Sequence, residues 1–401
     1  MRILEISSRK ELEELMQEIK VDPYGIKIMA PKAISYLLRI NSLSNITANI
    51  LKQEMLSLGA DAAIARDALT GKSKKTDCLL MGTQAEFNRL KAKIDRQPFG
   101  LRQIAKELSG AIENYERNRF VLNLGRFRLD LSRPKIMGIV NLTPDSFSGD
   151  GVYRVSRSKG IKASEVLNFV ERMVRDGADI IDVGGESSRP GAKPISVKEE
   201  LARTQPVIKI LAKKIKVPIS IDTYKPEVAR QALDCGVSIV NDITGLRNPK
   251  MASLVARYRA GVVIMHMKGT PRTMQQQPVY KSLIDEIIEY LSRAIERASE
   301  VGIKREKIII DPGIGFGKTL EHNLEILKRL KEFKILGQPI LVGTSRKSFL
   351  GKILGVGPQE RIFGTVSSCI LAIKNGAHIL RVHDVKEVKQ ALKVAVAIMH
   401  A

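Results

Sequence analysis

The sequence predicts a closed (β/α)₈ barrel, in which eight parallel strands alternate with helices. Eight short apolar runs are rich in β-branched residues, which is typical of parallel strands buried on both faces. A helix-like segment follows each run, and nearly every run ends in a polar or charged residue. The runs are 135–140, 180–184, 219–222, 238–241, 262–266, 308–311, 340–344 and 379–383. Active sites of such barrels lie at the carboxyl ends of the strands, so the sequence predicts a catalytic barrel over residues 119–401.

The first 118 residues predict a separate, smaller α/β domain, because a barrel of this kind takes roughly 250 residues. Residues 1–7 and 77–82 are typical of strands, and residues 9–19, 44–70, 85–94 and 100–117 have helical spacing. No catalytic cluster stands out here, so the role of this domain is left open. Residues 120–132, with Gly125 at the turn, predict a hairpin that closes the lower end of the barrel.

The chain is strongly basic, with 66 Lys and Arg against 43 Asp and Glu and a net charge of +23. Such a charge favours nucleic acid or an anionic small substrate as partner, unless it belongs to a Lys/Glu-rich surface of the thermophilic kind. Aromatic residues make up 4% of the chain, and basic stretches that contain aromatics are absent, which argues against base stacking. We therefore expect no nucleic-acid partner. A non-catalytic RNA-binding barrel is the alternative from another class.

The three cysteines, Cys78, Cys235 and Cys369, lack the spacing of a metal site. They are typical of thiols in a reducing compartment. The amino-terminal residues lack the apolar stretch of a signal peptide, and no run approaches the roughly 20 apolar residues of a membrane span. We expect a cytoplasmic protein without a membrane partner.

The loop after the first run offers oxygens for a cation. Asn141 supplies an amide oxygen and Asp145 a carboxylate, and Mg²⁺ prefers a few protein oxygens together with phosphate. Phe147 lies between two acids, and glycines follow it. This composition favours a lid over the barrel, although an ordinary surface loop is the alternative.

Acids and an amide end three further runs, at Asp222, Asn241 and Asp311. A carboxylate buried at a strand end needs a partner, or its pKa rises. A substrate with adjacent N–H groups would be that partner, and a structural salt bridge is the alternative. The glycines after Asp311 match neither the Walker A nor the dinucleotide motif. We expect them to allow close approach of a ligand, with Phe316 as an apolar wall.

Cationic and hydroxyl side chains gather after the second, seventh and eighth runs. Ser188 and Arg189 follow the second run, and Lys347 lies beside Ser348 where a helix should begin. Helix amino termini bind anions. Arg381 and His383 share one face of the last strand, and arginine can bind phosphate with two hydrogen bonds. His266 is either a ligand or, as we favour, a core histidine.

These strings together identify a resemblance that covers residues 119 to 400. The chain resembles the dihydropteroate synthase family in the strings MGIVNLTPDSFS, DVGGESSRPGA, ISIDTYKPEVA, VNDI, MHMKGTPRTMQ, DPGIGFGK, GTSRKSFLG and RVHDV. The resemblance implies a transferase that joins 6-hydroxymethyl-7,8-dihydropterin diphosphate to 4-aminobenzoate, with Mg²⁺ as cofactor and a homodimer as assembly.

The resemblance also implies a role for each matching residue. The pterin-binding positions are Asp222, Asn241, Asp311 and Lys347, and the diphosphate and Mg²⁺ positions are Asn141, Arg381 and His383. The second loop carries Ser188 and Arg189, and the aminobenzoate positions are Phe147, Pro190, Phe316 and Ser348. Val382 is a further substrate-binding position, and Asp145, Lys347, Arg381 and His383 are the expected catalytic residues. Family members commonly carry Thr at the position of Ser188, which keeps the hydroxyl group.

A dissociative reaction fits a nucleophile as weak as aminobenzoate. The diphosphate would leave first, and Asp145 would stabilise the cation that remains. The nearest alternative is a pterin-dependent methyltransferase that passes a methyl group from a folate to a corrinoid protein. That enzyme would share the acidic contacts to the pterin but has no use for a diphosphate site.

Overall fold

A computed structural model describes residues 1–6, 8–72, 74–143, 163–187, 189 and 191–399. The chain forms two compact units, Met1–Glu113 and Asn114–Ala401. The division falls inside helix α6 (Leu101–Glu116), five residues before the predicted position. The division into separate domains at 1–118 and 119–401 stays a prediction.

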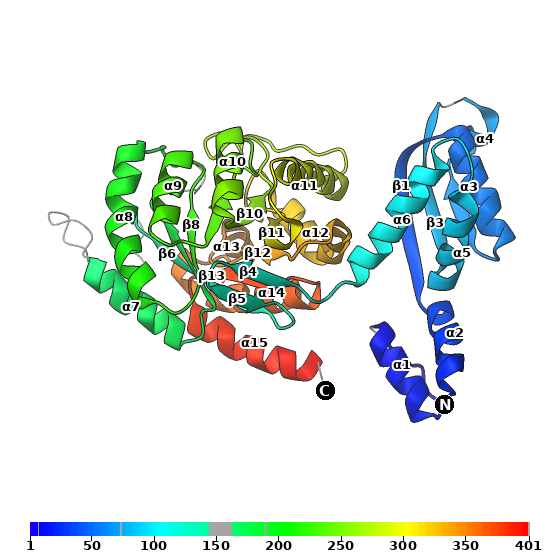
Figure 1. Cartoon of the computed structure of the whole chain (residues 1–401), viewed down its shortest axis with the longest axis horizontal. Helices are drawn as coiled ribbons and strands as arrows, with labels where there is room; N and C mark the ends of the chain where they lie inside the picture. Colours follow the sequence, from blue (N-terminus) through cyan, green and yellow to red (C-terminus); the bar gives the residue numbers. More distant parts are fainter. Residues whose placement is uncertain (7, 73, 144–162, 188, 190, 400–401) are drawn as a thin grey trace. The chain divides into compact units, whose positions relative to one another are not determined.

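The amino-terminal unit is built on a three-stranded antiparallel sheet with the strand order β1-β3-β2. The strands are β1 (Ser35–Ser44), β2 (Asp61–Ile64) and β3 (Lys75–Thr83). Helices α3 (Asn45–Ser57), α5 (Gln84–Ile94) and α6 bury their apolar residues against the sheet, with Phe87 and Leu80 among the fully buried side chains. Figure 1 shows α3 and α5 beside the strands. A short helix, α4 (Arg66–Thr70), completes this part.

Two sequence predictions for this unit are wrong. Residues 1–6 form no strand, and Ile3 is fully exposed. A strand needs a hydrogen-bonding neighbour, and the sheet of this unit consists of β1, β3 and β2, so residues 1–6 are not part of it. Residues 44–70 are not one helical region, because β2 divides them. The helix at 9–19 is confirmed as α1 (Arg9–Glu18), which packs on α2 (Pro23–Ala33) through Leu12 and Ala30.

The second unit is the predicted barrel of eight parallel strands (Figure 1). The sheet order is β11-β10-β9-β8-β7-β6-β13-β12, and a parallel bridge between Ile310 and Ile340 joins its two ends. The strands are β6 (Lys135–Asn141), β7 (Ile180–Gly184), β8 (Ile219–Asp222), β9 (Ile239–Asp242), β10 (Gly261–Met265), β11 (Ile308–Asp311), β12 (Leu341–Val342) and β13 (Ile379–Val382).

Amphipathic helices follow the strands and bury their apolar faces against the outside of the barrel. They are α7 (Ala163–Arg175), α8 (Val197–Lys214), α9 (Pro226–Asp234), α10 (Pro249–Tyr258), α11 (Leu283–Glu300), α12 (Leu320–Lys328), α14 (Ile362–Lys374) and α15 (Val385–Met399), with 3₁₀ turns at Arg305–Lys307, Leu330–Leu336 and Pro358–Glu360. A short extra helix, α13 (Ser348–Leu354), follows β12. Within the described residues, no helix is both long and apolar enough to span a membrane.

A hairpin fills the lower end of the barrel, as the sequence predicts. Strands β4 (Val121–Leu124) and β5 (Phe127–Asp130) pair antiparallel across Gly125. Their leucines pack against one layer of inward-facing strand residues, which consists of Met137, Ile180, Ile239, Val263, Ile309, Leu341 and Ile379. This apolar layer closes the bottom, so polar groups inside the barrel can lie only above it.

Candidate active site

Above the apolar layer, the next layer of inward-facing side chains carries most of the charged groups inside the barrel. Side chains two residues apart on a strand point to the same face, so each lower-layer residue has an inward-facing neighbour above it. Above Ile180, Ile239, Ile309 and Ile379 stand four polar residues, namely Asp182, Asn241, Asp311 and Arg381. The fold therefore gathers two acids, an amide and a guanidinium from four strands at one depth.

Arg381 lies between two carboxylates. Its Nε is 2.7 Å from Asp182 Oδ2, and its Nη2 is 2.7 Å from Asp222 Oδ2. Asn241 Nδ2 donates to the same oxygen of Asp182 at 3.1 Å. Asp182 is fully buried, and its Oδ1 accepts no hydrogen bond from any described residue. A buried carboxylate with an unused acceptor suits a ligand that brings an N–H group.

Burial shifts the pKa values of three charged groups at this end of the barrel toward neutrality. Desolvation raises the pKa of Asp222 to about 7, while Arg381 opposes the rise and Asp182 adds to it. Desolvation also lowers the pKa of Lys347 to about 8, with Arg381 adding to the fall. The pKa of Asp311 is raised by burial, against a hydrogen bond from the Gly313 amide to Asp311 Oδ1 at 2.7 Å. Perturbed groups of opposite sign that interact with one another favour a functional site at this position.

Lys347 lies over an aromatic wall. Its Nζ is 4.2 Å from the centre of the Phe316 ring, a cation–π arrangement. Lys347 is also the N-cap residue of α13, so Ser348 is the first residue of that helix, and Ser348 is exposed. The cation, the ring and the hydroxyl group are therefore placed at the same helix end.

His383 is held neutral and in one orientation. Burial takes its pKa well below the usual 6.5, and the neighbouring charges of Arg346 and Arg381 lower it further. The backbone amide of His383 donates to Ser345 Oγ at 3.2 Å, and this oxygen lies 3.0 Å from His383 Nδ1. Since Ser345 accepts from the amide, its own proton is free to reach Nδ1. With Ser345 donating to Nδ1, the ring carries its proton on Nε2 and presents it as a hydrogen-bond donor.

Asn141 ends β6 next to the Asp222 carboxylate. A Cβ atom placed on Gly184 between them would lie 3.6 Å from Asn141 Oδ1 and 3.7 Å from Asp222 Oδ2. The described residues contain no group of three His, Cys, Asp or Glu side chains that would hold a metal by themselves. A metal ion at Asn141 would need most of its ligands from substrate and water. Mg²⁺ accepts such a coordination, so the residues fit it.

The glycines after Asp311 pack against protein, which differs from the close approach to a ligand that we expected. Gly313 has φ +72°, and a Cβ there would lie 1.9 Å from the carbonyl oxygen of His266. Gly317 has φ +63°, and its Cβ would lie 2.6 Å from the carbonyl oxygen of Lys268. A side chain at either position would separate this loop from the end of β10. The glycines thus hold the Phe316 wall in place.

The structure also describes two other predicted site residues, Arg189 and Val382. Arg189 is exposed, and its charge contributes to the low pKa values of Lys347 and His383, which places it near both. The side chain of Val382 packs in the layer between strands and helices. It is a neighbour of Arg381 on the strand, so its side chain faces outward. Substrate binding at Val382, which would have to use its backbone, stays a prediction. Asp145, Phe147, Ser188 and Pro190 lie outside the described residues.

Sequence-based prediction missed three charged residues of this region, and Asp182 and Lys318 are two of them. Asp182 is inside β7 rather than at its end, so a search limited to strand ends does not find it. The signal was an acid within an otherwise apolar run, IIDVG. Lys318 is 2% exposed, and its Nζ lies 3.0 Å from His266 Nδ1. His266 is itself buried and kept neutral, which agrees with the core histidine that we favoured.

A third missed residue, Lys225, ties the loop after β7 to the loop after β8. Its Nζ lies 2.5 Å from Glu186 Oε2, 2.6 Å from Glu200 Oε2 and 2.8 Å from the Ile195 carbonyl oxygen. Glu186 also accepts from the Ile195 amide at 3.0 Å and from the Tyr224 hydroxyl at 2.7 Å. Both ends of the segment that contains Arg189 are thereby fixed to one buried ion cluster.

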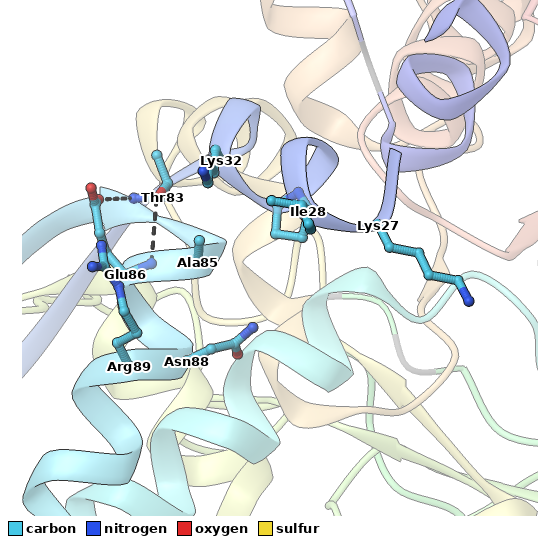
Figure 2. A pocket seen from close by; sticks show the side chains of 9 residues that line it. Lys27, Ile28, Lys32, Thr83, Ala85, Glu86, Asn88 and Arg89 are labelled. Carbon is cyan, nitrogen blue, oxygen red and sulfur yellow. Dashed lines mark hydrogen bonds between the residues drawn. The ribbon is translucent and has the colours of Figure 1, made fainter. Parts of the chain in front are cut away.

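A cavity of about 630 Å³ lies in the amino-terminal unit, between α2 and α5 (Figure 2). Its one carboxylate, Glu86, accepts from the Thr83 amide at 2.7 Å in a capping box at the start of α5. Lys27, Lys32 and Arg89 also line it. The acid is used by the helix itself, so this cavity has no group of acids comparable to that in the barrel.

Comparison with known proteins agrees with this geometry. A family model described as pterin binding enzyme matches residues 137–383. The dihydropteroate synthase of Escherichia coli K12 is 45% identical over 273 residues, which are 68% of this chain and 94% of that protein. The protein of the same name from Synechocystis is 47% identical over 268 residues, or 66% of this chain and 90% of that protein. A crystal structure of Yersinia pestis dihydropteroate synthase with a sulfonamide drug has 41% identity and a TM-score of 0.67, and covers 70% of this chain and all of that one.

The barrel and its polar layer thus define a pterin-binding enzyme. Within that class, the chain belongs to the dihydropteroate synthase family. The amino-terminal unit also has a counterpart. A Halobacterium salinarum protein named a probable bifunctional folylpolyglutamate synthase/dihydropteroate synthase is 37% identical over 394 residues, which are 98% of this chain and 46% of that protein.

Proposed function

We propose that the barrel joins 6-hydroxymethyl-7,8-dihydropterin diphosphate to 4-aminobenzoate, giving 7,8-dihydropteroate and pyrophosphate. The observation that carries this proposal is the pairing of Arg381 with Asp182 and Asp222 in the polar layer, beside Lys347. The site combines carboxylates for the N–H groups of a heterocycle with cations for a phosphate chain.

The pterin ring would replace Arg381 as the hydrogen-bonding partner of Asp182 and Asp222. Its amino and ring N–H groups would donate to Asp222 and to the unused oxygen of Asp182, and Lys347 would donate to its carbonyl oxygen. A carboxylate that accepts N–H bonds is stabilised in its charged form, which offsets the burial that raises the pKa of Asp222. The guanidinium would then turn toward the diphosphate.

The diphosphate would be bound by Arg381, by the Nε2–H group of His383 and by Mg²⁺ held at Asn141. When bound, Mg²⁺ supplies positive charge to the phosphate oxygens. A neutral His383 suits this role, because an additional buried cation would repel Arg381. Both side chains donate hydrogen bonds that strengthen as negative charge gathers on the leaving group.

The reaction would proceed through loss of the leaving group. The bond between the pterin methylene carbon and the diphosphate oxygen breaks, and pyrophosphate departs with the electron pair. The cation on the methylene carbon is delocalised into the electron-rich dihydropterin, and Asp145 would add negative charge nearby. The aminobenzoate nitrogen then attacks that carbon and loses a proton to solvent. Phe316 would pack against its ring, and Ser348 would donate to its carboxylate at the start of α13, beside the second loop with Arg189.

The decisive experiment incubates the purified chain with the pterin diphosphate, labelled aminobenzoate and Mg²⁺. We expect labelled dihydropteroate and one pyrophosphate for each product formed. A pterin-dependent methyltransferase would bind the pterin without releasing pyrophosphate, and that result would refute the proposal. Omitting Mg²⁺ should lower the rate without abolishing pterin binding.

We also infer a cytoplasmic homodimer. Cys78 and Cys369 are buried free thiols, as in proteins of reducing compartments. Helices α14 and α15 expose apolar side chains, among them Phe363 (80%), Leu371 (57%) and Val394 (61%), and such surfaces are typical of subunit contacts. Light scattering on the Phe363→Glu variant tests the dimer. A dimer that the substitution leaves unchanged would argue against this surface.

A further inference from the structure

Lys318 is a buried cation for which the proposed reaction has no use. It lies in the loop between β11 and α12 and is 2% exposed. None of the ion pairs found among the described residues includes it. Its Nζ instead lies 3.0 Å from His266 Nδ1 and donates to the Phe316 carbonyl oxygen at 3.0 Å. Burying an ammonium group without a bound carboxylate is unfavourable, so its position calls for a physical reason.

The contacts of Lys318 join the end of β10 to the loop that carries Phe316. A protonated lysine can only donate, so His266 Nδ1 must accept and the neutral ring carries its proton on Nε2. Burial lowers the pKa of His266 to about 2, with the charges of Lys318, Arg247 and Lys268 adding to the fall. The histidine therefore stays neutral, and its Nδ1 accepts as long as Lys318 is protonated.

The ammonium group also lies behind Asp311. A Cβ atom on Gly313 would be 3.4 Å from Lys318 Nζ, and the amide of the same glycine donates to Asp311 Oδ1 at 2.7 Å. Three cations favour the charged form of Asp311, namely Lys347, Lys318 and Arg381. Asp311 in turn favours the charged form of Lys318, while Lys347 and burial disfavour it.

Substrate binding would change the contacts of two of these three cations and leave those of the third unchanged. Arg381 would turn toward the diphosphate, and Lys347 would donate to the pterin carbonyl. Lys318 is 2% exposed and already bound to two protein groups, so we expect it to keep both when the ligand binds. It is therefore the positive charge that remains behind Asp311 when the ligand enters.

We propose that Lys318 is a positioning residue of the pterin site, which keeps Asp311 ionised to accept the pterin N–H groups and holds the Phe316 loop against β10. The inference rests on the proposed function, since it takes Asp311 as a pterin contact. It adds a residue that touches neither substrate yet sets the pH range over which pterin binds.

The direction in which pH changes pterin affinity follows from the charges of Asp311 and Lys318. Pterin needs Asp311 as carboxylate, so affinity falls as pH drops through the pKa of that group. Replacing Lys318 by methionine removes a stabilising charge and raises the pKa of Asp311, so the loss of affinity begins at higher pH. The pKa of Lys318 is lowered to about 7, chiefly by burial. Above pH 8.5 the wild-type side chain is mostly neutral, and the charge effect should vanish there.

The test is the dissociation constant of 6-hydroxymethyl-7,8-dihydropterin diphosphate, measured by calorimetry with Mg²⁺ from pH 5.5 to 9. In Lys318→Met we expect the acid limb to move to higher pH by about one unit, which is about tenfold weaker binding on the steep part of that limb. At pH 8.5 the two proteins should differ by less than about threefold, which is the share of the lost hydrogen bonds. Asp222 titrates in both proteins, so it does not produce the difference.

Two further variants make the result specific. Lys318→Gln retains a donor for Phe316 without the charge and should show the same shift of the acid limb, even if the methionine variant folds poorly. Lys328→Met removes one positive charge from an exposed position on α12 and should leave the curve unchanged. A constant loss of affinity at every pH in both Lys318 variants would overturn the inference. If the wild-type chain bound no pterin at any pH, the proposed function would fail instead.

Discussion

Arg381 makes two charge-assisted hydrogen bonds, one to Asp182 and one to Asp222, and burial raises the pKa of Asp222. Such pairs contribute less to stability than their distances suggest, because desolvation opposes the attraction. Their role in the proposed function is that a ligand can replace each partner of the ion pair. A ligand with N–H groups at one end and phosphates at the other can take over both halves of the pair, so little charge is left unpaired when it binds.

Removing the guanidinium should damage catalysis more than folding. In Arg381→Ala we expect kcat/KM for the pterin diphosphate to fall at least tenfold, because a hydrogen bond to a charged group contributes about 1.5–3 kcal/mol. Steady-state kinetics with both substrates measures the change. Arg230→Ala, which breaks an exposed pair with Asp234, is the control. Unchanged efficiency in the Arg381 variant would contradict its assigned role.

The pKa values of Asp222 and Lys347 predict a narrow pH optimum. Asp222 must be ionised to accept from the pterin, so kcat/KM should fall as pH drops below about 7. Lys347 must be protonated to donate, so kcat/KM should also fall as pH rises above about 8. In Lys347→Arg the basic limb should disappear, because the guanidinium stays charged. Rate profiles from pH 5.5 to 9.5 test both limbs, and a basic limb that persists in this variant would assign it to another group.

At the scale of elements, each loop above the barrel is fixed to its neighbour by a particular contact. The loop after β11 packs on the end of β10 through Gly313 and Gly317. The loop after β7 is tied to β8 through Lys225, with side chains of 12%, 11% and 1% exposure in Lys225, Glu186 and Glu200. The strands fix how deep in the barrel the polar residues lie. The loop contacts fix the positions of the loops around the site.

Breaking the Lys225 cluster should therefore destabilise the protein strongly. Lys225→Met leaves two buried carboxylates without their cation, and the expected loss is about 3–5 kcal/mol in the free energy of unfolding. Arg230→Met, at an exposed pair on α9, should cost less than about 1 kcal/mol. Urea unfolding at pH 7 compares the two. Equal small losses would show that the cluster is not needed to hold the loop.

At the scale of the whole molecule, helix α6 begins in one unit and ends in the other. Its end and the residues that follow pack on the barrel unit. Asn114 Nδ2 donates to the Ile335 carbonyl oxygen at 3.0 Å, and Lys334 Nζ donates to Asn118 Oδ1 at 2.7 Å. The Phe120 ring meets His378 edge-on at 4.9 Å. The barrel thus includes residues before the position 119 at which the sequence resemblance begins.

Two shortened chains test this boundary. A chain that begins at Asn114 should retain the kcat/KM of the full chain, because the active-site contacts described above all lie after it. A chain that begins at Arg119 loses both hydrogen bonds, at about 1 kcal/mol each. Its Tm should be lower by a few degrees, as scanning calorimetry would measure. Loss of activity in a folded chain from Asn114 would show that the amino-terminal unit contributes to catalysis.

The sequence by itself determined the eight strands, the hairpin below them and most of the polar residues above them. Those features depend on local periodicity and on residue type at strand ends, which neighbouring residues fix. It did not determine that Asp182 faces inward beside Asn241 or that Val382 faces outward, because the inner face is defined only when the sheet closes. The partners of Arg381 lie 199 and 159 residues away along the chain. Only the closed barrel brings them within a hydrogen bond, and only packing against β10 accounts for Gly313 and for the burial of Lys318.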